Sequence, residues 1–304
     1  MVGLGVGLEA VTVTALVGGF AYAAYKDVQS REVSDGLWQL LGAVGTVVGF
    51  LAVAPAGLVP VVLWAAVAAL ALEHLFPWDE AFGEAHAGWV PAVELGAYGV
   101  VFVAVGYAAF RFGIGPGAVP VGALAAAVTV VLARGLFELG VLYGGADAKA
   151  LIVAGLLVPV FAAPPLAPAI DTVVLGVLPF SVTLLTDAAV LSLVVPIAIG
   201  VRNVARGEFS FPRGFTSYTL AVEDLPRRFV WVRDPGLGAD TLVDDAETSL
   251  EDTQRRGKLA RELRERGVSR VWVTPQLPFL VLMAAGTFTG LLAGNLLLDL
   301  FSAL

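Results

Sequence analysis

Residues 142 to 151 read L-Y-G-G-A-D-A-K-A-L and place one carboxylate, Asp147, between two long apolar runs. The preceding run covers Ala118 to Tyr143, and the following run covers Ala150 to Ala163. Both can form membrane helices, because crossing the hydrocarbon core takes about 20 mostly apolar residues. Asp147 is therefore predicted where a helix enters or leaves the bilayer, a position at which an ionisable residue indicates function.

A second aspartate, Asp27, has a similar setting. It lies in Y-K-D-V-Q-S-R-E-V-S-D-G-L-W (residues 25 to 38), where the first apolar run gives way to polar residues. Two carboxylates at the same membrane depth can share one proton and activate a water molecule between them, which is the chemistry of aspartyl proteases. We therefore expect Asp27 and Asp147 to act as a pair.

The residues around both aspartates resemble a known family. Gly144 to Lys149 resembles the G-x-G-D motif of membrane aspartyl proteases, with Ala146 in place of the second Gly. Asp27 and Arg31 resemble the D-x-x-x-R pattern of type IV prepilin peptidases, and the resemblance is strongest to the archaeal preflagellin (archaellin) peptidases. The family tolerates small apolar residues at the position of Ala146. Val271 to Phe279 is also similar to the segment before the last helix of the archaeal enzymes.

This resemblance implies an endopeptidase in the cell membrane that works at the cytoplasmic face. Its substrates would be pre-archaellin or type IV pilin-like precursors with class III signal peptides, from which it removes a short basic leader. Asp27 and Asp147 would be catalytic, and the residues supporting the two motifs would be Gly144, Gly145, Ala146, Lys149 and Arg31. The resemblance implies neither a metal nor an organic cofactor.

The composition indicates an integral membrane protein. The chain has 304 residues, of which 58% are hydrophobic and 14% charged, and its mean hydropathy is +0.85. A water-soluble core of this size needs fewer apolar residues. The net charge of −8 would suit a protein exposed to a high-salt cytoplasm, where salt screens the repulsion between acidic residues. A single acidic loop is the simpler explanation of this charge. The absence of Cys excludes disulfides and thiolate metal sites. The sequence contains no nucleotide-binding fingerprint, and we expect no nucleic-acid partner.

We expect an all-α polytopic bundle of about eight transmembrane helices with a small cytoplasmic α/β insert. Residues 1–201 would hold the bundle and both aspartates, residues 202–276 the insert, and residues 277–304 the last helix. In the insert, Phe229–Val232 and Val271–Val273 predict strands and Asp245–Arg266 predicts a charged helix. The expected membrane helices are Leu4–Tyr25, Leu37–Ala54, Leu58–Leu75, Val90–Phe110, Ala118–Tyr143, Ala150–Ala163, Val173–Val201 and Leu277–Leu298.

This helix count places both aspartates on one side of the membrane, because four crossings, an even number, separate them. The insert follows two further crossings and contains most of the Lys and Arg, so the positive-inside rule makes that side cytoplasmic. The loop Phe76–Trp89 would be cytoplasmic as well. It contains Asp79, Glu80 and His86 close to His74, but their spacing follows no metal-ligand motif, so we expect a solvated interfacial loop.

Other interpretations of these charges are open. Asp147 alone could be a helix N-cap, and Asp27 alone could form an i,i+4 ion pair with Arg31. A secondary transporter could use Asp27, Glu138 and Asp147 as a proton relay. The charges inside the apolar runs are expected to face the bundle interior, and Arg134 and Glu138 are expected to pair; these charges are Glu9, Glu94, Arg134, Glu138 and Asp187.

Overall fold

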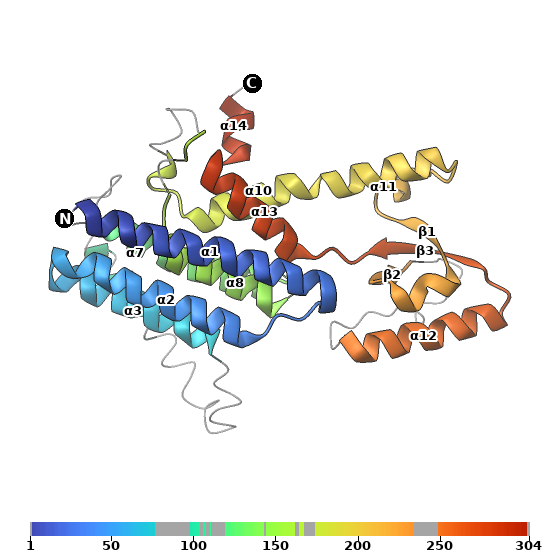
Figure 1. The fold of residues 1–304 in the computed structure, drawn as a ribbon, viewed down its shortest axis with the longest axis horizontal. Helices are drawn as coiled ribbons and strands as arrows, with labels where there is room; N and C mark the ends of the chain where they lie inside the picture. The colour runs from blue at the N-terminus through green and yellow to red at the C-terminus, as the bar shows by residue number, and fades with distance from the viewer. Residues whose placement is uncertain are drawn as a thin grey trace. The chain divides into compact units, whose positions relative to one another are not determined.

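The computed structural model describes most of the chain as helices with one small antiparallel sheet (Figure 1). The residues it describes are 2–76, 96, 98–103, 106–107, 110, 119–142, 144–161, 164–166, 174–233 and 249–302. They form two compact units. The first unit contains Met1–Gln29, Val33–Val190 and Phe279–Leu304, and the second contains Ser30–Glu32 and Leu191–Pro278.

Several helices are long and apolar enough to cross a membrane, which makes this a multi-pass membrane protein. Within the described residues these are Gly7–Ser30, Asp35–Ala56, Leu58–Leu75, Val121–Glu138 and Phe180–Ala205. The helices Phe279–Leu292 and Leu296–Ser302 would add a sixth crossing if they form one span, although they meet at an angle of 56°. The expected helix Val90–Phe110 and the loop Phe76–Trp89 lie largely outside the described residues, as does Glu94.

The first unit begins with α1 (Val2–Ser30), α2 (Asp35–Val53), the short 3-10 helix η1 (Ala54–Ala56) and α3 (Leu58–Leu75). It continues with α7 (Val119–Glu138) and α8 (Gly145–Leu157). These helices lie alongside one another, and α8 packs mainly against α2 and α7 (Figure 1).

Helix α8 lies at the centre of this group. Its 13 residues are too few for a crossing of their own, so it differs from the expected Ala150–Ala163 helix. Every residue from Ala150 to Leu157 is buried, as expected for a helix that is apolar on all sides. Glycines allow the close approach: a Cβ on Gly45 would lie 2.9 Å from the Leu156 backbone, and one on Gly155 would lie 2.7 Å from Thr129.

The expected Val173–Val201 helix is α10 (Phe180–Ser192), nearly all of which lies in the first unit, followed by α11 (Val194–Ala205), which belongs to the second unit. The last helix is bent, and its two parts, α13 (Phe279–Leu292) and α14 (Leu296–Ser302), complete the first unit. Asp187 of α10 is fully buried, as expected for a charge in an apolar run. Its carboxylate accepts hydrogen bonds from the Thr289 hydroxyl and the Leu296 N–H, both 2.8 Å long, and thus holds the break before α14.

The second unit contains a three-stranded antiparallel sheet. Its strands are β1 (Tyr218–Ala221), β2 (Val230–Val232) and β3 (Arg270–Pro275), in the order β1-β3-β2. Helix α12 (Ser249–Glu265) packs against the 3-10 helix η3 (Val222–Arg227) and contributes Leu259 and Leu263 to a small core. The expected elements β2, β3 and α12 are present, and β1 is an additional strand that we had not expected.

Candidate active site

The structure brings the carboxylates of Asp27 and Asp147 close together within the first unit. Asp27 lies in the last turn of α1 and Asp147 in the first turn of α8, and both side chains are half-buried. The charge of Asp27 acts directly on the Asp147 carboxyl. Asp147 lies outside the helices long enough to cross the membrane, and burial, followed by the Asp27 charge, raises its pKa above the usual range.

Asp147 is held by its own helix terminus. Gly144 is the N-cap of α8, so Asp147 occupies the third helical position and is not itself the N-cap. Its N–H donates to the Gly144 carbonyl at 3.0 Å, and its carboxylate accepts the Gly144 N–H in return. The contact from the Asp147 carboxylate back to the N-cap N–H is one half of a capping box; the other half is missing because Gly144 has no side chain.

The glycines of the motif have different roles in this geometry. Gly144 has φ −101° and ψ 130°, a conformation that any residue adopts. A Cβ at Gly144 would lie 3.2 Å from Asp147 Oδ2, so glycine leaves room for the carboxylate to fold back. A Cβ at Gly145 would meet nothing within 4 Å, and Ala146 packs against the core. Of the two glycines, only Gly144 has a steric role in this structure.

The Asp27 side chain accepts a hydrogen bond from a backbone group that is far from it in the sequence. Its Oδ2 accepts the backbone N–H of Leu280 at 3.1 Å. Because α13 begins at Phe279, this N–H is one of the donors that a helix start leaves without an intrahelical partner, and a carboxylate is favoured there. The sequence analysis did not find this contact. Pro278, directly before the apolar run, was the available signal for a helix start.

Arg31 lies beyond the end of α1 and belongs to the second unit. It has a left-handed backbone (φ 59°), which is outside the helical geometry of α1. Its guanidinium donates to the Gln276 carbonyl at 2.9 Å and lies 5.0 Å from the centre of the Phe229 ring. These contacts tie the α1–α2 connection to the strands of the second unit.

Lys149 forms an ion pair with Asp35, with 2.6 Å between Nζ and Oδ1. Asp35 is the first residue of α2, so the pair joins the starts of α2 and α8. Asp35 lies eight positions after Asp27 in the same polar stretch and is not among the residues predicted for the site. The pair gives the Lys149 cation a partner other than the two aspartates.

The remaining charged candidates are engaged elsewhere. Arg134 and Glu138 form the expected ion pair at 2.8 Å, which occupies a carboxylate that the transporter interpretation needs as a relay. His74 has its Nε2 3.1 Å from the Tyr98 hydroxyl and its Nδ1 3.0 Å from Glu73. Asp79, Glu80 and His86 lie outside the described residues, and the part that is described contains no cluster of three or more possible metal ligands.

Comparison with known proteins does not add an identity. No protein-family model matches the chain, and a search of the curated proteins finds no similar sequence. A functional assignment therefore depends on the residues and their geometry.

Proposed function

We propose that this protein is a membrane-embedded aspartyl endopeptidase with Asp27 and Asp147 as its catalytic residues. The observation that carries the proposal is the pairing of these two carboxylates in one unit, although they come from distant parts of the chain. The motifs around them support it, because they resemble those of type IV prepilin and preflagellin peptidases.

The chemistry needs one ionised and one protonated carboxyl. The ionised group takes a proton from a water molecule that attacks the peptide carbonyl, and the protonated group donates to the carbonyl oxygen. The raised pKa of Asp147 supports the presence of a protonated carboxyl near neutral pH. The two groups interact and titrate as a pair, so the proposal assigns the acid and base roles to the pair as a whole.

The proposed substrates are pilin-like or pre-archaellin precursors that carry a short basic leader before an apolar helix. The resemblance supports this class of substrate and cleavage at the cytoplasmic face. The arginines that follow the Phe180–Ala205 span support a cytoplasmic location of the second unit, since basic residues collect on that side of the membrane, and Arg31 of that unit is four residues after Asp27. The arginines after the span are Arg206, Arg213, Arg227, Arg228 and Arg233.

Leader removal is the direct test of the proposal. The protein is co-expressed with a tagged pre-archaellin or prepilin, and the loss of the leader is followed as a shift in gel mobility. Cleavage by the unmodified chain, together with loss of cleavage in Asp27→Asn and Asp147→Asn variants of equal abundance, is the expected result. A precursor that stays uncut, or one cut equally by both variants, would overturn the assignment.

The proposed membrane orientation can be tested separately, because the chain has no native Cys. Glu223 is exposed in the second unit and is a suitable position for a single Cys. A membrane-impermeant thiol reagent should leave Glu223→Cys unlabelled in intact cells and label it after the cells are opened. Labelling in intact cells would place this unit outside and contradict a cytoplasmic active site.

A further inference from the structure

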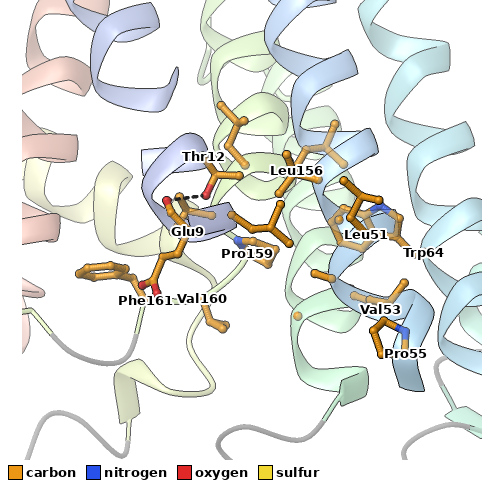
Figure 2. A pocket seen from close by; sticks show the side chains of 18 residues that line it. Glu9, Thr12, Leu51, Val53, Pro55, Trp64, Leu156, Pro159, Val160 and Phe161 are labelled. Atoms are coloured by element: carbon orange, nitrogen blue, oxygen red, sulfur yellow. Dashed lines mark hydrogen bonds between the residues drawn. The ribbon is translucent and has the colours of Figure 1, made fainter. Parts of the chain in front are cut away.

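The helix bundle of the first unit contains a pocket of about 620 Å³ that involves neither Asp27 nor Asp147. Its walls come from the first half of α1, the end of α2, the early turns of α3 and α7, and the end of α8 with the segment after it. Figure 2 shows its side chains, among them Glu9, Thr12, Trp64, Pro159 and Phe161. We call it the Glu9 pocket.

The Glu9 pocket lies at one face of the bundle. Glu9 lies in the first third of α1 and is exposed. Thr12 and Trp64 are further inside their spans, so the pocket continues toward the hydrocarbon core. Glu9 and Asp27 are about 27 Å apart along α1, which places the pocket at the opposite end of that helix from the aspartates.

The walls of the pocket are apolar, and the polar groups deeper inside are already bonded. The Thr12 hydroxyl donates to the Glu9 backbone carbonyl at 3.1 Å, and Trp64 Nε1 donates to the Thr46 carbonyl at 3.0 Å. Among the described residues that line the pocket, Glu9 is the one with an ionisable side chain. Its side chain points toward Val160 and Phe161 (Figure 2). Within the described residues, the Glu9 carboxylate has no cationic partner.

The segment after α8 keeps the pocket open. Leu157 ends α8, and the backbone from Val158 to Phe161 is irregular. Phe180 of α10 holds this segment in place: its N–H donates to the Pro159 carbonyl at 3.0 Å, and its ring meets the Phe161 ring edge to face. Irregular backbone at membrane depth is tolerated where it is covered by protein or lines a cavity, and here it lines one.

We propose that the Glu9 pocket binds a membrane lipid whose headgroup carries an amine. An acyl chain fits the apolar walls, and the volume is within the range of ligand pockets in proteins, roughly 300–1,000 Å³. The Glu9 carboxylate is exposed at the pocket, so an ammonium group on the ligand can reach it and form an ion pair. An anionic headgroup would be repelled by Glu9. The proposal is independent of the peptidase function.

The test compares two lipids that have the same acyl chains. The full-length protein in detergent is heated with phosphatidylethanolamine or with phosphatidylglycerol, and Tm is measured for the unmodified chain and for variants. The amine lipid is expected to raise Tm by about 4 °C more than the anionic lipid, because a ligand that binds only the folded state stabilises it. Equal shifts with both lipids would overturn the proposal.

Two variants separate the headgroup contact from the acyl-chain contact. Glu9→Gln should give equal Tm shifts with the two lipids, whereas Glu265→Gln, an exposed glutamate in the second unit, should keep the difference. Gly122→Phe should reduce both shifts, since a Cβ there meets only Pro159 at 3.8 Å and the ring would fill the pocket. If Gly122→Phe does not fold, Ala52→Phe at an exposed lining position takes its place. A lipid preference that persists in Glu9→Gln would contradict the role of the carboxylate.

Discussion

Two sites in the first unit hold aspartates, and they hold them in different ways. Asp187 is fully buried, and each of its oxygens accepts a hydrogen bond from a group at the break between α13 and α14. Asp27 and Asp147 are half-buried, and each accepts a backbone N–H at the start of a helix. They also lie close enough to act on each other electrostatically.

Under the proposed function, the difference separates a structural carboxylate, that of Asp187, from two catalytic ones. The Asp187 carboxylate satisfies donors at a broken helix, and removing it would leave a buried donor without a partner. The Asp27 and Asp147 carboxylates are brought together despite their mutual repulsion, which opposes folding while both are ionised. A costly arrangement of this kind is expected at a functional site, and substitutions at the two sites should therefore have opposite effects on activity and stability.

The largest expected effect is on cleavage. Asp27→Asn and Asp147→Asn should each lower leader removal by more than about a thousandfold, because one carboxyl cannot act as both acid and base. Neither variant should lower Tm, since an amide removes the repulsion between the two groups. The measurements are a mobility-shift assay of the precursor and thermal unfolding of the purified protein. Near-normal cleavage by either variant would remove the distinction between the two sites.

Asp187→Ala should have the opposite effect. It leaves the Leu296 N–H without its acceptor, at a cost of about 1–3 kcal/mol, so Tm should fall by several degrees. Asp187→Asn keeps an oxygen acceptor, so its Tm should fall less than that of Asp187→Ala. Cleavage per folded molecule should be unchanged in both variants. If Asp187→Ala retains its Tm but loses activity, Asp187 belongs to the chemistry and the comparison fails.

The glycines beside Asp147 provide a matched pair of variants. Gly144→Ala brings a methyl group to 3.2 Å from Asp147 Oδ2 and should slow cleavage about 10- to 100-fold by displacing the carboxylate. Gly145→Ala meets no atom within 4 Å and should stay within about threefold of the unmodified enzyme. The rates are compared under single-turnover conditions. Equal rates for the two variants would show that the fold-back of Asp147 onto Gly144 is unimportant for activity.

The smallest effect is expected from the ion pair between Lys149 and Asp35. The pair is partly exposed, with side-chain exposures of 21% and 43%, so Asp35→Asn or Lys149→Met should slow cleavage by about tenfold or less. Exchanging the two charges, in Asp35→Lys with Lys149→Asp, should recover part of that loss if the pair positions α8 against α2. A double variant that is slower than either single variant would show that Lys149 acts through other contacts.

The sequence predicted the elements that depend on long runs of similar residues. The apolar runs of α1, α2, α3 and α7 identified membrane helices, and the position of each aspartate at the end of an apolar run indicated a shared depth. The expected helix Ala150–Ala163 is shifted along the chain relative to α8, which begins five residues earlier at Gly145 and ends at Leu157, because the motif residues are already helical and the apolar composition continues past Leu157 into irregular backbone. Periodicity does not show where such a helix ends.

Contacts between distant residues could not be predicted in the same way. The hydrogen bond that Asp27 accepts comes from the backbone N–H of Leu280, and almost every residue type has such a group, so the residue at position 280 gives no signal. The Asp35–Lys149 ion pair depends on how α2 packs against α8. The break before α14 did have a local signal. Gly294 has φ 94°, and the Asn295 side chain accepts hydrogen bonds from the N–H groups of Leu297 and Leu298. The dipeptide Gly-Asn inside an apolar run therefore indicates a turn followed by a helix N-cap.

The contact between Asp27 and Leu280 also sets an order of events during synthesis. Asp27 leaves the ribosome early, while Leu280 lies near the end of the 304-residue chain. Until α13 has entered the membrane, the Asp27 carboxylate lacks the donor that orients it, even if α1 and α8 have already packed. A chain that stops before α13 therefore has both aspartates but not the hydrogen bond between Leu280 and Asp27.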